Sequence, residues 1–299
     1  MRRIVGKDKK GRTVLINVPS YDDMYINNQF GPQTAYNIAI SSNDSGSASS
    51  STPAVPVVTS TQKAIFGYGY SGASLSMTNL VSSTGVVAAD TTGVGTARTY
   101  LAAAGYGTDK AIFGYGLTSV NVSLTNLVSN AGVVAIDTTG VGTARYTLAA
   151  AGYGTDKAIF GYGLASGVSS LTNLVSNTGI VAIDTTGVGT ARWILAAAGY
   201  GTDKAIFGYG LDNIKLSLTN LVSNTGVVAT DTTGVGTARS QLAAAGYGTD
   251  KAIFGYGEAG VGNCSITNLV SNTGVVASNQ AALTGTARIS LAAAGYSLT

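Results

Sequence analysis

Three features of the sequence predict an all-β fold, a five-bladed β-propeller with four strands in each blade. The string Lys-Ala-Ile-Phe-Gly-Tyr-Gly occurs five times with a period of 47 residues, starting at Lys63, Lys110, Lys157, Lys204 and Lys251. Each copy contains four short apolar runs separated by turn residues, which is the strand number of a propeller blade. The 41 glycines interrupt every segment that could otherwise form a long helix.

The second copy shows how the strands are assigned. Its four runs are residues 99–106, 111–115, 124–129 and 133–136. The first run belongs to the end of the preceding copy in the sequence. The first copy starts at the second strand of a blade, whereas the chain finishes with residues 288–296, a first strand without a second. We therefore expect the C-terminal strand to close the ring on the first blade, which removes free sheet edges.

Each repeat resembles the kelch repeat over residues 61–299. The resemblance lies in an arginine (Arg145), a run of small apolar residues (148–151), a turn (154–156) and the strand that begins at Lys157. In the kelch family this strand ends in Gly-Gly, but here it ends in Gly-Tyr-Gly, and the Trp expected on the outermost strand is missing. The resemblance therefore implies a kelch-like propeller, not a kelch domain in the strict sense.

Composition divides the chain into three parts. Residues 1–40 lack the repeat and contain one predicted strand, 13–18, so we interpret them as a short N-terminal anchor that is ordered by a partner protein or by copies of itself. A disordered tail is the alternative. Residues 41–61 are rich in Ser and Thr and contain Pro53 and Pro56, which is typical of a linker. Residues 62–299 form the predicted propeller.

Several classes of function are disfavoured by composition. The chain has no histidine, which removes the commonest general base and the usual ligands of catalytic metals. A net charge of +3 does not indicate nucleic-acid binding, and no apolar run is long enough to span a bilayer. The single Cys264 cannot form an intramolecular disulfide. We expect no catalytic residues, no metal, no cofactor, no nucleic-acid partner and no membrane insertion.

An enzyme of propeller fold is disfavoured by the same reasoning. The propeller oxidases hold copper through histidine, and acidic residues in the variable loops do not cluster beyond Asp212 and Glu258. An Asp and an Arg recur eight residues apart in four copies, yet the fifth copy replaces the Asp region with Ser278-Asn279-Gln280. We therefore predict structural, blade-to-blade hydrogen bonds for the arginines, which are Arg98, Arg145, Arg192, Arg239 and Arg288.

The positions at which the five copies differ form the candidate binding site. One variable zone follows Gly-Tyr-Gly, at residues 70–76, 117–123, 164–170, 211–217 and 258–265, and the other is the residue pair after each arginine. In a four-stranded blade both zones emerge on one face, and loops on a rigid scaffold often carry recognition. Neutral drift at exposed positions is the alternative. The predicted ligand-binding residues are Tyr100, Tyr146, Trp193, Gln241, Asp212, Lys215 and Asn121.

Near-identical repeats, a diversified face, a distinct anchor and a Ser-rich linker resemble the fibre, tail or collar proteins of bacteriophages. This resemblance implies a non-enzymatic appendage on the virion surface. Residues 1–40 would bind other virion proteins, and the propeller would bind a host-surface glycan or protein as part of a multi-copy assembly. An intracellular kelch-type adaptor that binds a protein partner is the alternative.

Overall fold

The computed structural model describes residues 2–7, 13–18, 63–280 and 285–295. The chain divides into two compact units, Met1–Val57 and Val58–Thr299, and each is considered by itself. Strands and loops make up all of the described residues, so the fold is all-β with several small antiparallel sheets. Within the same ranges no helix is long and apolar enough to cross a membrane.

The N-terminal unit contains one antiparallel pair of strands. Strand β1 (Arg2–Lys7) pairs with β2 (Thr13–Val18) over their full lengths. The predicted strand at 13–18 is thus confirmed. Strand β1 was not predicted, because three of its six residues are Arg or Lys, which are uncommon in strands. The other residues of the predicted anchor, and the whole of the predicted linker 41–61, lie outside the described ranges.

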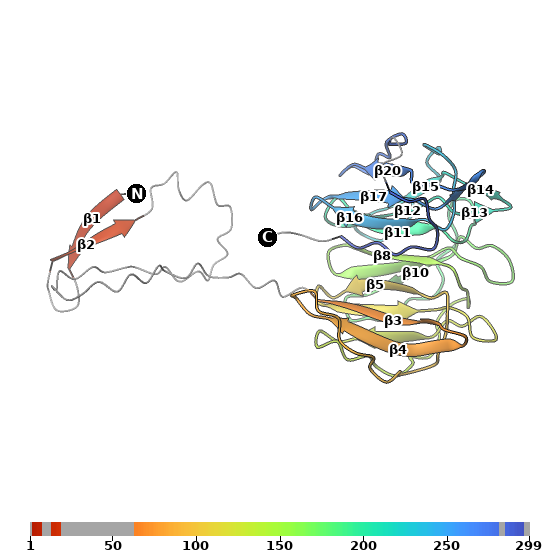
Figure 1. Cartoon of the computed structure of the whole chain (residues 1–299), viewed down its shortest axis with the longest axis horizontal. Coiled ribbons are helices and arrows are strands. Elements are labelled where there is room, and N and C mark those ends of the chain that lie inside the picture. Colours follow the sequence, from red (N-terminus) through yellow and green to blue (C-terminus); the bar gives the residue numbers. More distant parts are fainter. Residues whose placement is uncertain (1, 8–12, 19–62, 281–284, 296–299) are drawn as a thin grey trace. The chain divides into compact units, whose positions relative to one another are not determined.

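One two-stranded sheet and four three-stranded sheets, one for each repeat, form the framework of the second unit and follow one another along the chain (Figure 1). The two-stranded sheet of the first repeat contains β3 (Ala64–Tyr70) and β4 (Ser74–Val81). The three-stranded sheets are β5 (Ala102–Tyr106), β6 (Lys110–Gly114) and β7 (Thr125–Val128); β8 (Ala149–Tyr153), β9 (Lys157–Gly161) and β10 (Thr172–Val175); β11 (Ala196–Tyr200), β12 (Lys204–Gly208) and β15 (Thr219–Val222); and β16 (Ala243–Tyr247), β17 (Lys251–Gly255) and β20 (Thr267–Val270).

The fourth predicted strand of each blade is reduced to isolated bridges. In the second repeat, Val134 bridges to Val128 and Thr138 to Thr125, with one backbone hydrogen bond from Ala135 N to Leu127 O between them. The prediction of a regular strand at 133–136 is therefore wrong. The run pairs with its neighbour only at separate positions, so a continuous ladder does not form. Two further hairpins lie in loops, β13 (Leu211–Asp212) with β14 (Ile214–Lys215) and β18 (Glu258–Ala259) with β19 (Gly262–Asn263).

Neighbouring sheets contact each other through their first strands. Strand β5 contacts β8, β8 contacts β11, and β11 contacts β16. The triple Ala of these strands permits this close approach. In the described residues the series does not close into a ring: β3 pairs with β4 alone, and residues 291–295 form no strand. The four internal hairpins join first and second strands covalently, whereas closure must join the two chain ends at a larger entropic cost.

A phenylalanine and a glycine form the core of each junction between successive repeats. Phe160 of the third repeat occupies the space beside Gly114 of the second, where an added Cβ would lie 2.6 Å from its Cζ atom. The ring of Phe160 is fully buried and lies 5.2 Å from the ring of Tyr115. Burial of one such ring contributes roughly 1.5–3 kcal/mol. The same contact recurs at the pairs Gly67–Phe113, Gly161–Phe207 and Gly208–Phe254.

Substitution of Gly161 by alanine tests this junction. A Cβ atom there would lie 2.7 Å from Phe207 Cζ, so we expect Gly161→Ala to lower the free energy of unfolding by about 1–3 kcal/mol through overpacking. Urea unfolding measures the change. The control is Gly167→Ala, because Gly167 is exposed and has no atom within 4 Å of the added Cβ. Equal stability of the two variants would contradict a tightly packed junction.

Candidate functional site

The strand directions give each sheet two chemically different ends. Strand β5 runs toward the turn that precedes β6, and β6 runs back, so Ala102 lies opposite Gly114 and Tyr106 lies opposite Lys110. The end with Tyr106 and Lys110 is called the turn end, because it carries the near-constant Gly-Thr-Asp turns. The other end is called the variable end, because both variable zones follow or precede the strands there.

Backbone bridges bring the two variable zones together. The first residue after the buried arginine pairs with the first residue after Gly-Tyr-Gly in the same sheet. These antiparallel bridges are Thr99–Leu117, Tyr146–Leu164, Trp193–Leu211 and Ser240–Glu258. Positions that vary between copies are therefore in direct contact, and sequence comparison of the five repeats was enough to find them.

The second residue after each arginine adopts a left-handed backbone conformation. These five residues are called the display column: Tyr100 (φ 53°), Thr147 (φ 51°), Ile194 (φ 45°), Gln241 (φ 53°) and Ser290 (φ 53°). Their backbones are linked from repeat to repeat, since each amide N–H after the first donates to the carbonyl of the preceding member at 2.9–3.1 Å. These backbone hydrogen bonds do not depend on the side chains, and one further hydrogen bond joins Ser290 Oγ to Gln241 Oε1 at 3.0 Å.

Left-handed geometry is costly for the residues found in the display column. A residue with a Cβ atom loses roughly 1–2 kcal/mol there relative to right-handed backbone, and glycine avoids this cost. None of the five positions is glycine, and two of them hold the β-branched residues Thr147 and Ile194. A simple turn would be more stable with glycine. All five members nevertheless carry side chains, and the five side chains differ.

The three predicted aromatic residues lie in successive repeats of the variable end. Tyr100 is 60% exposed, and its ring lies 6.1 Å from that of Tyr146 with an interplanar angle of 56°. Tyr146 and Trp193 are half-buried and occupy the equivalent bridge position of neighbouring repeats. Tyr100 and Tyr146 thus form an accessible aromatic pair, of the kind that packs on sugars or on apolar side chains.

The predicted polar residues contact neighbouring loops. Asn121 donates through Nδ2 to Ala165 O at 3.2 Å, and Lys215 donates to Ala259 O at 2.6 Å. Lys215 also forms an ion pair of 3.2 Å with Glu258, which in turn accepts from Gln241 Nε2 at 3.1 Å. These side chains connect successive repeats at the variable end.

Asp212 takes no part in those links between repeats. It lies in the β13–β14 hairpin, where it accepts a hydrogen bond of 3.2 Å from Asn213 Nδ2.

The arginines connect successive repeats deeper in the structure. Arg98 is fully buried, with its guanidinium 4.4 Å above the ring of Tyr68 in its own repeat. It donates to Tyr115 O at 2.8 Å and to Asn126 Oδ1 at 2.6 Å in the next repeat. Arg145, Arg192 and Arg239 are equally buried, and each lies above the tyrosine of its own repeat. Burial lowers the pKa of all four guanidinium groups, and the adjacent tyrosines oppose that change.

A carboxylate completes three of the four junctions. Asp137 accepts from Thr96 N at 2.9 Å and from Thr96 Oγ1 at 2.6 Å, and it lies 3.7 Å from Arg98 Nη1. Partial burial acts to raise the pKa of Asp137, but the hydrogen bonds from Thr96 and Asn126 and the charge of Arg98 outweigh it and hold that pKa below its ordinary value. The same balance lowers the pKa of Asp184 and Asp231.

Asparagine replaces the carboxylate at the fourth junction. Asn279 accepts from Thr237 N at 3.1 Å and donates to Thr237 Oγ1 at 2.8 Å, so the hydrogen bonds remain while the charge is lost. Arg288, at the end of the fifth repeat, is exposed, although its guanidinium lies 3.9 Å above the ring of Tyr256. Its only described hydrogen bond goes to Thr286 O at 3.1 Å.

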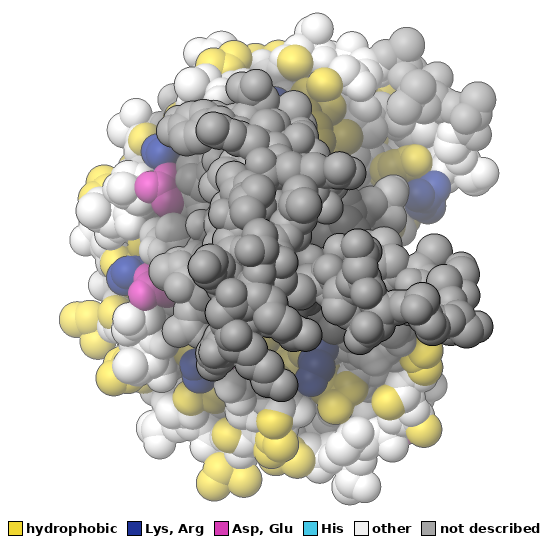
Figure 2. Space-filling model, turned by 90° about the vertical axis from the view of Figure 1, so that its left-hand side faces the viewer, with side chains coloured by type: hydrophobic (Ala, Val, Ile, Leu, Met, Phe, Trp, Pro, Cys, Tyr) yellow, Lys and Arg dark blue, Asp and Glu magenta, His cyan; other side chains and the backbone are white. Residues whose placement is uncertain are grey.

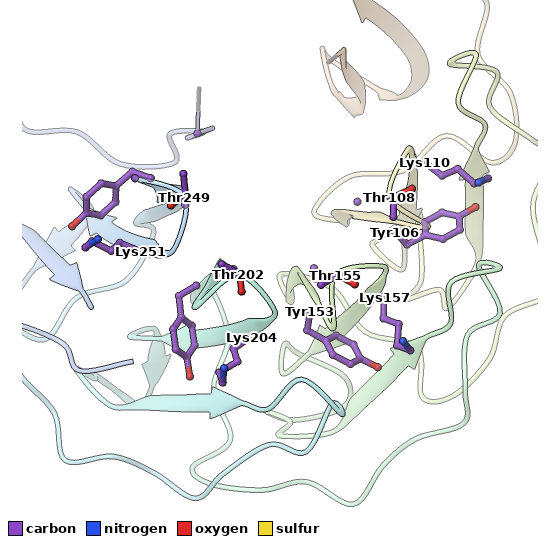
Figure 3. Close-up of a pocket in the computed structure, with 18 residues that line it drawn as sticks. Tyr106, Thr108, Lys110, Tyr153, Thr155, Lys157, Thr202, Lys204, Thr249 and Lys251 are labelled. Carbon is purple, nitrogen blue, oxygen red and sulfur yellow. The ribbon is translucent and has the colours of Figure 1, made fainter. Parts of the chain in front are cut away.

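A cavity of about 660 Å³ lies at the turn end, opposite the variable end. It is lined by the Tyr, Thr and Lys side chains of four turns, which surround it in Figure 3, and by Gly295. Each lysine is paired with the adjacent aspartate at 2.7–2.8 Å, and Figure 2 shows charges of opposite sign next to each other on this side of the molecule. Our interpretation of the sequence did not identify this cavity. The identical turns in four copies were the available signal.

Comparisons with known proteins give little beyond the all-β class. No family model matches the chain, and no curated protein matches it. Among solved structures, one match is described as a novel fungal alcohol oxidase with catalytic diversity among the AA5 family, in complex with copper. The identity is 10% and the TM-score 0.48, over 76% of this chain and 64% of that one. The chain thus spans under two thirds of the length of that structure.

This comparison corrects one expectation from the sequence. The lack of histidine led to the prediction that the chain is not an enzyme, and the structure just named is described as an oxidase. The prediction is therefore wrong as a general statement. Since the TM-score is below 0.5, the likeness supplies no argument for a reaction. Among the described residues, no three Asp, Cys or Glu side chains are grouped so that they could hold a metal ion.

Substitution of Asp184 by asparagine isolates the charge at one junction. We expect Asp184→Asn to lower the free energy of unfolding at pH 7 by about 1 kcal/mol, after allowance for partial solvent exposure, because Asn279 shows that the amide preserves the hydrogen bonds. The pKa of Asp184 is lower in the folded than in the unfolded state, so its contribution is present above pH ~4 and is lost as pH falls through the folded pKa. Wild type and variant should converge in acid.

Urea unfolding of both proteins between pH 7 and pH ~3 measures this convergence. The matched control is Asn279→Asp, which adds a carboxylate beside Arg239 and should increase stability at pH 7. A difference between wild type and Asp184→Asn that is independent of pH would contradict the charge argument.

Substitution of Ile194 tests the cost of the display column. Asparagine tolerates left-handed backbone better than a β-branched residue does, so we expect Ile194→Asn to raise the free energy of unfolding by about 1 kcal/mol, or Tm by about 2–4 °C. The control is the opposite substitution at Asn213, an exposed residue that also has left-handed backbone (φ 52°). There, Asn213→Ile should lower the free energy of unfolding by a similar amount. Calorimetry measures both. A loss of stability in Ile194→Asn would contradict the proposed backbone cost.

Proposed function

We propose that residues 62–299 form a five-bladed, kelch-like propeller that serves as a virion surface appendage and binds a host-surface glycan or protein through its variable end. Residues 1–40 would attach it to other virion proteins, and several copies would be displayed together. The observation that carries this proposal is the display column, in which five repeats present five different side chains on one backbone geometry.

The junctions supply the rigid support that such a surface needs. The contacts made by Phe160, Arg145 and Asp184 are nearly the same at each junction, whereas the residues that differ are gathered at the variable end. Recognition surfaces commonly consist of variable loops on a constant scaffold. The repeats are nearly identical elsewhere, so their differences at the variable end support a binding role for that end.

The composition of the variable end suits a neutral or weakly charged ligand. Tyr100, Tyr146 and Trp193 offer aromatic surface, while Lys215 and Glu258 are paired with each other. Aromatic side chains supply contact area at a small cost in conformational entropy. A single site of this kind binds weakly, and display of several copies on one particle would raise the overall affinity.

Binding of the full-length protein to bacterial cells and to a glycan array tests the proposal. We expect binding that is lost when Tyr100, Tyr146 and Trp193 are all changed to alanine. The control changes three exposed apolar residues outside the variable end to alanine, namely Ile136, Ile183 and Val227, and should bind normally. Equal loss in both variants, or no binding by the wild type to any cell or glycan, would contradict the proposal, and the latter would favour the adaptor alternative.

A further inference from the structure

The buried arginine of the fourth junction differs from the other three in its surroundings. Arg239 is fully buried, like Arg98, Arg145 and Arg192. At the first three junctions, a carboxylate oxygen lies 3.5–3.9 Å from Nη1 of the arginine. At the fourth junction Asn279 takes that place, and Arg239 forms no ion pair with a carboxylate in the described part of the chain. A buried charge without an opposite charge is costly, and buried charges in proteins are normally paired.

One edge of the Arg239 guanidinium also carries hydrogen-bond donors without partners. The Nε–H and Nη2–H groups of an arginine lie side by side on this edge and together fit one anion. In Arg98 and Arg192, the edge donates to a tyrosine carbonyl at 2.8 Å and to an asparagine Oδ1 at 2.6 Å. In Arg239, both nitrogen atoms are buried and have no partner among the described residues. The equivalent acceptor, Asn268 Oδ1, also lacks a partner there, so this hydrogen bond is missing at both of its ends.

The groups that act on the pKa of Arg239 show the same contrast. Burial lowers its pKa, as it does for the other three buried arginines. At those three, an aspartate is among the groups that oppose the change. At Arg239 the opposing groups are Tyr209 and Cys264, neither of which is a carboxylate. The described residues therefore leave Arg239 as a buried cation with an unused pair of donors.

We infer that the fourth junction binds a halide ion, with chloride as the probe, between the Nε–H and Nη2–H groups of Arg239. The ion supplies the negative charge that an aspartate supplies at the first three junctions. A halide is favoured over phosphate or sulfate, because the guanidinium is fully buried and a multivalent oxyanion loses more hydration energy on burial. A water molecule could accept the same hydrogen bonds, but it would leave the charge unbalanced.

The halide site would support one part of the variable end. Arg239 directly precedes Ser240, which bridges to Glu258, and Gln241, which belongs to the display column. An ion that holds the guanidinium in place therefore also restrains the backbone at which these side chains begin. The inference concerns the junction alone and does not depend on the proposed function.

Thermal unfolding of the full-length protein at constant ionic strength gives the first test. Sodium chloride is exchanged stepwise for sodium gluconate, because gluconate is too large for a buried site. We expect chloride to raise Tm by about 2–4 °C once its concentration is several-fold above the dissociation constant, since a ligand that binds only the folded state stabilises it. A Tm that does not depend on chloride would overturn the inference.

Two matched variants separate a specific site from a general effect of salt. Asn279→Asp should abolish the chloride dependence, because its carboxylate supplies the charge and repels an anion. The control is Asp231→Asn, which removes the carboxylate beside Arg192. The Nε and Nη2 atoms of Arg192 are bonded to Tyr209 O and Asn220 Oδ1, so this variant should respond to chloride only as the wild type does. An unchanged response in Asn279→Asp, or a doubled response in Asp231→Asn, would overturn the specific site.

NMR of the quadrupolar chloride nucleus detects the ion directly and does not depend on unfolding. We expect the wild type to broaden the chloride resonance more than Asn279→Asp does, and bromide to reverse the extra broadening by competition. Equal broadening by the two proteins would show that no halide binds beside Arg239, even if chloride changed Tm.

Discussion

The buried arginine at each junction is the interaction on which the remaining structure depends. Arg98 and its equivalents are fully excluded from solvent, and removal of a charge from water costs several kcal/mol unless partners replace the water. For Arg98 those partners come from two repeats: a tyrosine ring beneath the guanidinium, and a carbonyl, an amide and a carboxylate in the next repeat. Arg192 has the same set, Arg145 lacks the carbonyl bond, and Arg239 keeps the tyrosine ring while its Nε and Nη2 atoms have no partner in the described structure. The arginine therefore fixes both the distance and the orientation between successive sheets.

The same requirement explains the Gly-Tyr-Gly sequence of each repeat. The tyrosines have left-handed backbone, with φ between 63° and 65°, a conformation that a bulky residue rarely adopts. Burial, the overlying arginine and, in the first four repeats, a hydrogen bond from the tyrosine hydroxyl to a valine carbonyl offset that cost. Burial also raises the pKa of Tyr115 and Tyr162 to about 12, so both rings remain neutral beside the cation.

The sequence was sufficient for the parts of the fold that depend on local pattern. The 47-residue period located the second and third strands of each repeat, and differences between copies located the residues that meet at the variable end. The prediction of a regular outermost strand at 133–136 was wrong, because apolar composition does not show whether the run pairs continuously with the neighbouring strand. The Phe–Gly contact and the left-handed display column involve neighbouring repeats in space, so periodicity alone could not reveal them. The cavity had a signal in the identical turns, but it exists only because the turns of four repeats lie together.

The equivalence of the four junctions also bears on how such a protein can change over generations. Recombination between near-identical repeats in a gene can delete or duplicate a whole copy. Here the first three junctions are made from the same residue types on both sides, so a chain that lost or gained one of these copies would keep matching residues between the remaining neighbours. The display column would gain or lose one member at the same time. Repeat exchange could thus produce new surfaces without the destabilisation that point mutations in a packed core usually cause.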